Sequence, residues 1–451
     1  MLEPKSCGSG LERLKADSHL ILESALDAVD PYKAVHSHVT REGRFLNVGT
    51  HRYDLQEVER VIVVGAGKAS ARMAVAIEEI LGDLISDGLI NVKYGHGEPL
   101  RKITVWEAGH PVPDQAGIEG ARRLLTLVKD ANERDLVICL ISGGGSSLLP
   151  QPTSGIDLLS KQETTRALLE SGATIHQVNA VRKHISDVKG GRLAQAAAPA
   201  RVVSLLLSDV IGDDLDVIAS GPTVPDTTTF ASALDVLDRY DLTGRVPVNV
   251  PSHLRAGVRG DNPETPKPGD AVFNNVVNVI IANNAGAINA AAEKAHSLGY
   301  KPLVLSSFIQ GEAREVARVM AAIAREIAVT GRPIARPACV IAGGETTVTL
   351  KGTGAGGRNQ ELALQASLDI ENIENILILA AGTDGTDGPT DAAGAIASGK
   401  TLAVARELGL SARDYLANND SYHFFKAIGD LVMTGPTGTN VMDIILILAG
   451  Q

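Results

Sequence analysis

Aromatic residues and net positive charge are both lacking in this sequence of 451 residues. Aromatic side chains make up 3% of the chain, with one tryptophan, which leaves little material for the stacking platforms that bind single-stranded nucleic acid. The net charge is −11, and an acidic surface repels nucleic acid and anionic membranes. We therefore expect no nucleic-acid partner and no membrane partner. A local basic pocket for a small anion is still compatible with this charge.

Cysteines and long apolar runs are also scarce. Cys7, Cys139 and Cys339 are too few for a disulfide framework, and no Cys–His or Cys-x-x-Cys spacing indicates a zinc site. Cys139 and Cys339 lie in apolar runs, so we expect buried thiols. No run reaches the roughly 18 apolar residues of a membrane span, and MLEPKSCGSGLERLKAD lacks the apolar region of a signal peptide. These absences favour a cytoplasmic protein.

The composition is that of a globular protein, with 44% hydrophobic and 21% charged residues. A chain of this length exceeds one ordinary core, so we expect two domains. Apolar, β-branched runs at 60–64, 102–106, 135–142 and 201–208 alternate with stretches of helical periodicity. This alternation predicts two layered α/β domains, the first Rossmann-like with a mostly parallel sheet.

A proline-rich stretch divides the two halves. Residues 243–270 contain five prolines and little periodicity, which is typical of a linker or a long surface connection. We expect an N-terminal domain over 1–255, a linker over 256–270 and a C-terminal domain over 271–451. The second half begins with the apolar run VVNVIIAN, continues with helices over 284–298 and 312–327, and finishes on DIILILAG.

Glycine-rich turns follow several predicted strands, in VVGAGK, LISGGGSS, VIAGGE and LAAGTDG. Open α/β sheets bind ligands beyond the carboxyl ends of their strands. We therefore expect these turns to converge on a shared cleft.

The first turn, VVGAGKASARMA, places a lysine at the start of a helix. It is not a Walker A loop, because Ile62 and Ala69 stand at required Gly and Ser/Thr positions, and Ser70 breaks the dinucleotide fingerprint. The helix dipole disfavours a cation there, so Lys68 indicates an anionic partner, with a solvated surface lysine as the alternative.

The second turn, SGGGSS at 142–147, follows a strand without any cation. Successive glycine amides can form an anion-binding nest, and the serines add hydroxyl donors. The alternative is a tight corner, and the turn does not match the GxSxG pattern of serine hydrolases.

Carboxylates follow two other predicted strands. SDVIGDD supplies Asp209, Asp213 and Asp214, and GTDGTDGPTD supplies Asp384, Asp387 and Asp391. Such groups can accept a hydroxyl proton or hold Mg²⁺, although aspartates also form turns and caps.

Three further stretches carry polar groups of interest. Arg358 opens a helix after GTGAGG, where a cation again needs a neutralising anion. In GHPVPD, a structural hydrogen bond is favoured over a ligand contact for His110. The stretch VRKHISDVKGGRLA is typical of a solvated helix face, although its KGGR turn could hold a carboxylate; its basic residues are Arg182, Lys183, His184, Lys189 and Arg192. Basic groups, amide-rich turns and carboxylates are together the components of phosphoryl transfer.

These motifs, in this order from about Val61 to Ile444, resemble those of the glycerate 2-kinase family, whose second half is called the MOFRL domain. The resemblance implies ATP- and Mg²⁺-dependent phosphorylation of D-glycerate, with the active site in a cleft between the domains and the 2-hydroxyl as acceptor. The alternatives are phosphorylation of the 3-hydroxyl, an NAD(P)H-dependent hydroxypyruvate reductase, and a metabolite sensor without catalysis. The sequence leaves open whether the chain is a monomer or a homodimer.

The resemblance also implies site residues. The essential lysine and arginine of the family fall on Lys68 and Arg358, and Asp209 is the candidate acceptor of the hydroxyl proton. Asp209, Asp384 and Asp387 are the candidate metal ligands. We assign substrate or phosphate contacts to Gly67, Ser142, Gly143, Gly144, Gly145, Ser146, Ser147, Lys189 and Asn359. Two positions depart from the family pattern, since Ser147 replaces a frequent alanine and Met442 replaces a common asparagine.

Overall fold

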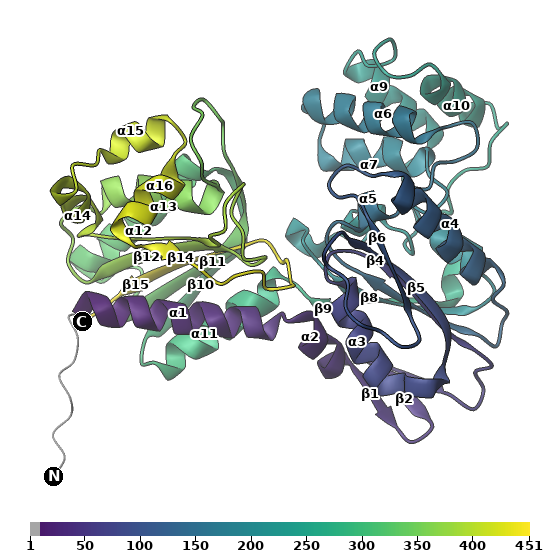
Figure 1. The fold of residues 1–451 in the computed structure, drawn as a ribbon, viewed down its shortest axis with the longest axis horizontal. Helices are drawn as coiled ribbons and strands as arrows, with labels where there is room; N and C mark the ends of the chain where they lie inside the picture. Colours follow the sequence, from purple (N-terminus) through teal and green to yellow (C-terminus); the bar gives the residue numbers. More distant parts are fainter. Residues whose placement is uncertain (1–9) are drawn as a thin grey trace. The chain divides into compact units, whose positions relative to one another are not determined.

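The computed structural model describes residues 10–451, which form two compact units (Figure 1). The parallel-sheet unit comprises Pro31–Ile281, and the mixed-sheet unit comprises the segment through Asp30 together with Ala282–Gln451. Cys7 lies outside the described residues. Within the described part of the chain, no helix combines the length and the apolar character that crossing a bilayer requires.

The main sheet of the parallel-sheet unit has the strand order β6-β5-β4-β7-β8-β9. The pairings β6–β5, β5–β4, β4–β7 and β7–β8 are all parallel. This is the Rossmann order. The sheet is extended from β4 in one direction by β5 and β6 and in the other by β7, β8 and β9, so the strand order reverses between β4 and β7. The strands are β4 (Val61–Ala66), β5 (Ile85–Lys93), β6 (Thr104–Ala108), β7 (Leu136–Ile141), β8 (Arg201–Leu207) and β9 (Val276–Ala282).

The central strands β4 and β7 are buried over their whole length, as parallel strands with covered faces must be. Helix α4 (Gln115–Lys129) packs Leu124 and Val128 against one face of this sheet, and α3 (Ser70–Leu81) contacts β4, β5 and β7. Asp114 caps α4 by accepting a hydrogen bond from Gly117 N at 2.9 Å, which fixes where that helix begins. The predicted α/β layering of the first half is therefore confirmed.

The remaining elements of this unit are short helices and a small antiparallel sheet, β1-β2-β3. The strands are β1 (Val39–Glu42), β2 (Phe45–Val48) and β3 (His51–Asp54). The helices are α2 (Pro31–His38), α5 (Gly145–Leu148), α6 (Leu158–Glu170), α7 (Ile175–His184), α8 (Arg192–Ala197), α9 (Phe230–Arg239) and α10 (Asn249–Val258).

The units divide at Ile281, not within the predicted linker at 256–270. Helix α10 buries Val250 and Leu254 in a helical core that includes α9. Thr265 is also buried, and its hydroxyl donates to Asp226 Oδ2 at 2.9 Å. Residues 256–270 therefore belong to the parallel-sheet unit, and β9, expected in the second domain, is the sixth strand of its sheet.

The mixed-sheet unit contains the strand order β10-β11-β15-β12-β13-β14. Strands β10 and β11 are parallel, and β15 pairs antiparallel with both β11 and β12. The strands are β10 (Lys301–Glu312), β11 (Ala338–Thr347), β12 (Ile376–Gly382), β13 (Gly394–Ser398), β14 (Leu431–Val432) and β15 (Asp443–Ala449).

Helices flank this sheet. Helix α1 (Gly10–Ala28) runs alongside α11 (Asn284–Ser297), although most of the chain separates them in sequence (Figure 1). Helices α12 (Ala313–Thr330) and α13 (Arg358–Asp369) share an apolar core with β11, β12 and β15. The other helices are α14 (Thr401–Glu407), α15 (Ala412–Ala417) and α16 (Ser421–Ile428). The expected thiol burial is confirmed, since Cys139 and Cys339 are both fully buried, and burial raises the pKa of each thiol to about 12.

Candidate active site

The turns that follow β4 and β7 are tied together at the point where the strand order reverses. Ala69 N donates to Ser142 Oγ at 3.0 Å, and Lys68 N donates to the Gly143 carbonyl at 2.9 Å. A methyl group at Gly67 would lie 2.0 Å from Ser142 Oγ, so only glycine fits there. The Ser142 hydroxyl therefore joins the two turns by accepting from the start of α3.

Gly143 and Gly144 gather three polar side chains around them. A methyl group at Gly143 would lie 2.3 Å from Asp209 Oδ2. One at Gly144, whose φ is 84°, would lie 2.8 Å from the His110 ring and 3.5 Å from Lys68 Cγ. Neither glycine amide donates to a backbone carbonyl within residues 10–451. The structure thus brings Lys68 and Asp209 to one turn, together with amides suited to an anion.

His110 is an uncharged group in a positively charged setting. Burial, reinforced by the charges of Lys68, Lys93 and His96, lowers the pKa of His110 to about 4. Burial and Lys93 also lower the pKa of His96. No hydrogen bond joins the His110 ring to another described residue, although the sequence favoured a structural one. The ring is therefore neutral at pH 7 and lies beside Gly144.

The other end of the same turn lies in a buried hydrogen-bond network. Lys189 Nζ donates to the Ser146 carbonyl at 2.6 Å and lies 3.0 Å from Ser146 Oγ. The hydroxyls of Ser146 and Ser220 are 2.8 Å apart, and Ser220 Oγ donates to Asn179 Oδ1 at 3.0 Å. Ser147 donates instead to the carbonyl of Gly144 at 3.0 Å, so its hydroxyl serves the turn itself.

Sequence reasoning missed Asn179 and Ser220. Ser220 and its neighbour Ala219 have positive φ angles, of 63° and 50°, which L-residues adopt at a cost. The available signal was the tripeptide GPT, which follows Ser220 at 221–223 and recurs at 388–390 and 435–437. Nothing in the helical stretch around Asn179 distinguished it from a surface residue.

The basic stretch 181–194 is not a solvated helix face. Lys183, His184 and Lys189 are each about 1% exposed or less. Lys183 Nζ lies 3.0 Å from Asp216 Oδ2 and 3.3 Å from Asp226 Oδ1, so its charge is compensated. The prediction of a solvated face is wrong for these residues.

In the mixed-sheet unit, Arg358 opens α13 and is held by carboxylates. Arg358 donates to both oxygens of Asp443, at 2.6 and 2.9 Å, and to Glu345 Oε1 at 2.7 Å. Burial alone would lower the pKa of Arg358, but Asp443 and Glu345 outweigh it and raise that pKa. The neutralising anion that the sequence led us to expect is therefore supplied by the protein itself.

Asp387 caps the same helix. Its two oxygens accept from Asn359 N at 3.1 Å and Gln360 N at 2.8 Å. Asn359 Nδ2 also donates to Asp443 Oδ1 at 3.0 Å, while its buried Oδ1 has no hydrogen-bond partner among the described residues. Burial raises the pKa of Asp387 to about 7. Asp384, in the same loop, accepts from Thr386 N at 3.2 Å.

The predicted metal ligands are divided between the two units, and their grouping around one ion stays a prediction. Asp384 and Asp387 follow β12, whereas Asp209 follows β8 in the other unit. The described residues contain one group of three ligating side chains within reach of a common ion, and its members are His176, Asp214 and Asp216.

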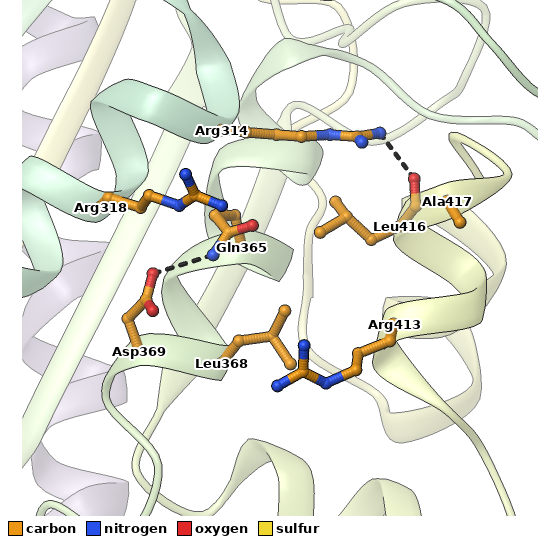
Figure 2. Close-up of a pocket in the computed structure, with 8 residues that line it drawn as sticks. All are labelled: Arg314, Arg318, Gln365, Leu368, Asp369, Arg413, Leu416 and Ala417. Atoms are coloured by element: carbon orange, nitrogen blue, oxygen red, sulfur yellow. Dashed lines mark hydrogen bonds between the residues drawn. The ribbon is translucent and has the colours of Figure 1, made fainter.

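A separate pocket of about 360 Å³ lies among α12, α13 and α15 (Figure 2). It is lined by Arg314, Arg318 and Arg413, but Arg314 donates to Glu361 Oε1 at 2.7 Å and to the Leu416 carbonyl at 2.6 Å. None of the predicted site residues lines this pocket. The candidate site residues lie elsewhere, in the turns that follow the strands of each unit.

A Rossmann-order sheet whose reversal point carries a lysine, open glycine amides and a carboxylate is typical of α/β proteins that bind small anionic ligands. Residues 17–255 match the family model described as a domain of unknown function (DUF4147), and residues 338–443 match the MOFRL family. The D-glycerate 2-kinase of Thermotoga maritima is 45% identical over 436 residues, which cover 96% of this chain and 98% of that protein. The glycerate 2-kinase of Pyrococcus horikoshii is 44% identical over 94% of this chain and 95% of its own length.

A crystal structure of glycerate kinase from Thermotoga maritima matches with a TM-score of 0.86 at 44% identity, covering 97% of this chain and all of that one. The chain belongs to the glycerate 2-kinase family. The resemblance that the motifs carried is thereby confirmed.

Proposed function

We propose that the protein transfers the γ-phosphoryl group of ATP to the 2-hydroxyl of D-glycerate. The observation that carries this proposal is the meeting of Lys68 and Asp209 at Gly143 and Gly144, in a member of the glycerate 2-kinase family. Phosphoryl transfer needs a positive charge near the transferring group and a carboxylate near the attacking hydroxyl. Lys68 supplies the positive charge and Asp209 supplies the carboxylate, and both lie beside this turn.

Asp209 is the group that would accept the hydroxyl proton. It is half-buried, and the absence of a side chain at Gly143 lets its carboxylate lie against the turn. A positioned general base contributes about 10²–10⁴-fold to a rate. Lys68 and the amides of Gly143 and Gly144 would stabilise the negative oxygens of the transferring group. His110, neutral at pH 7, can exchange hydrogen bonds with the ligand.

The mixed-sheet unit offers hard oxygen ligands. Glu345 and Asp384 present carboxylates of the kind that Mg²⁺ prefers, whereas Asp387 does not fit because both of its oxygens accept amides of α13. Bound Mg²⁺ would neutralise nucleotide phosphate charge. Arg358, through its ion pair with Asp443, would fix the start of α13 and the position of Glu345. The interdomain cleft that the resemblance implies stays a prediction.

The test is to incubate the protein with D-glycerate, ATP and Mg²⁺ and to follow ADP release, with phosphorus NMR of the product. We expect a 2-phosphate ester, whereas a 3-phosphate ester would overturn the regiochemistry. Lys68→Ala should abolish most turnover, while the exposed Lys129→Ala serves as the matched control. Oxidation of NADH with hydroxypyruvate would favour a reductase, and glycerate binding without turnover would favour a sensor.

A further inference from the structure

Three cations lie together in the parallel-sheet unit, and we call Lys161, Arg182 and Lys189 the basic cluster. Lys161 is 4% exposed, Lys189 is fully buried, and Arg182 is half-buried. Burial, followed by the positive charge of Arg182, lowers the pKa of Lys161 to about 7 and that of Lys189 well below its usual range. Asp187 is the one carboxylate whose charge opposes this effect at Lys161. The positive charge of the cluster is therefore only partly compensated.

The two lysines of the basic cluster hold backbone carbonyls. Lys189 Nζ donates to the Ser146 carbonyl, and Lys161 Nζ donates to the carbonyls of Pro150 at 2.9 Å and Gln151 at 3.3 Å. These contacts anchor both ends of the segment that follows the glycine turn. Neutral carbonyls fix the lysines in place but do not cancel their charge.

Arg182 has no such partner. Within residues 10–451, no hydrogen bond or ion pair joins its guanidinium to another residue, and burial lowers its pKa to about 10. Asn179 stands three residues earlier on α7, so the two side chains share one helix face. Asn179 is 2% exposed, and its Nδ2 has no hydrogen-bond partner among the described residues. Two donors on one face, next to a cluster whose charge is only partly compensated, are arranged to receive an anion.

We infer that Arg182, assisted by Asn179 Nδ2 and Ser146 Oγ, binds the carboxylate of a small 2-hydroxy acid. This inference rests on the proposed function, under which that acid is glycerate. The planar guanidinium fork matches the two oxygens of a carboxylate. Both lysines already donate to backbone carbonyls, so the Arg182 guanidinium is the one charged group of the cluster left to bind a ligand. A single guanidinium suits a singly charged carboxylate better than a chain of nucleotide phosphates.

The spacing along the turn fits an acid of this size. Gly143 lies against the Asp209 carboxylate, and Ser146 lies against the Lys189 and Asn179 network. Ser146 is three positions after Gly143, so the Cα atoms of these two residues are at most about 11 Å apart. In a 2-hydroxy acid, the carboxylate and the reacting hydroxyl are on adjacent carbons. Under this inference, one molecule meets Arg182 with its carboxylate and Asp209 with its 2-hydroxyl.

The experiment is to measure steady-state kinetics of Arg182→Gln with D-glycerate and ATP. We expect KM for glycerate to rise about 100-fold, because the carboxylate loses a charged partner, while KM for ATP stays within about two-fold. Arg182→Lys should restore part of the loss. The exposed Arg166 on α6 provides the control, and Arg166→Gln should leave both KM values unchanged.

Two further measurements separate binding from a structural role. Glycerol and D-glyceramide lack the carboxylate charge, so Arg182→Gln should weaken their use far less than that of glycerate. The variant should also melt no lower than the wild type, because an unpartnered, desolvated cation is removed. An unchanged KM for glycerate, or a rise in KM for ATP instead, would overturn the inference.

Calorimetry distinguishes failure of this inference from failure of the proposed function. If the wild type lacks kinase activity, the proposed function falls, but glycerate and glycerol can still be titrated into both proteins. Loss of the glycerate signal in Arg182→Gln alone would support the carboxylate site. Equal binding of glycerate by the two proteins would sink it even in an active kinase.

Discussion

Arg358 and Arg182 represent two ways of burying a cation in one chain. Arg358 is enclosed by Asp443 and Glu345, which neutralise it and fix the start of α13. Arg182 lies beside two further cations and has no carboxylate within ion-pair distance among the described residues. A protein that supplies both members of an ion pair gains a fixed position, whereas one that supplies only the cation leaves room for an external anion. Internal charge pairs hold Arg358 at the start of α13, whereas under the proposed function the 142–147 turn would receive the substrate.

The largest effect on activity is expected from removing the Asp209 carboxylate, which lies beside Gly143. Asp209→Asn should lower kcat by about 10²–10⁴-fold, because the hydroxyl loses its proton acceptor. Steady-state kinetics with D-glycerate and ATP measure this. Asp214→Asn, at an exposed neighbouring position, should retain activity. Comparable kcat values for wild type and Asp209→Asn would contradict the assignment of Asp209 as the general base.

The next effect concerns protein stability and the ion pairs of Arg358 at the start of α13. Asp443→Ala should destabilise the protein by about 3 kcal/mol, because Arg358 and Asn359 lose their buried acceptor. Glu345→Gln, at a 45% exposed partner, should cost less than about 1 kcal/mol. Thermal and urea unfolding measure both. If Arg182→Gln destabilised the protein as much as Asp443→Ala, the contrast between the two arginines would be lost.

The pH dependence of stability sharpens the same contrast. The pKa of Lys161 is lowered to about 7 in the folded protein, so the unfolded chain binds more protons between about pH 7 and its ordinary value near 10.5. Stability from this group therefore rises with pH across that window, by about 5 kcal/mol in total. Urea unfolding at pH 7 and pH 9 should show a larger gain for the wild type than for Lys161→Met. An equal gain in both would mean that Lys161 is not desolvated.

The smallest effect is expected at Ser147, whose hydroxyl donates to Gly144 within the turn. Ser147→Ala should lower stability by about 1 kcal/mol, the usual net contribution of one hydrogen bond. Both KM values should stay within about two-fold of the wild type. A tenfold rise in either KM would indicate that Ser147 contacts a ligand, as the sequence suggested.

Local sequence patterns predicted much of the fold. The runs at 60–64, 102–106, 135–142 and 201–208 coincide with β4, β6, β7 and β8, and the predicted helices at 284–298 and 312–327 coincide with α11 and α12. Strand β5 was missed because Asp87 and Gly88 interrupt its apolar pattern. The placement of β9 and α1 depends on contacts far apart in sequence, which no local pattern records.

The site was predictable in its residue types but not in their partners. The sequence showed that Arg358 needs an anion, yet only the fold shows that Asp443 fills that place. Asn179 and Ser220 carry no motif of their own and gain meaning from the turn beside them. Met442 is instructive in the same way, because its φ of 70° lies in the region that asparagine tolerates best, which gives a backbone reason for the asparagine common in the family.

The position of α1 has a consequence for how the chain folds as it is made. Leu14, Ile21, Leu22 and Ala25 are buried in the mixed-sheet unit, where Tyr300 OH also donates to Asp17 Oδ2 at 2.7 Å. This helix is made before the parallel-sheet unit, but its partner α11 and the strands it covers follow only after the whole of Pro31–Ile281. The parallel-sheet unit can fold as a continuous segment during synthesis. The mixed-sheet unit must wait for Ala282–Gln451, so α1 keeps an apolar face uncovered until those residues have been made.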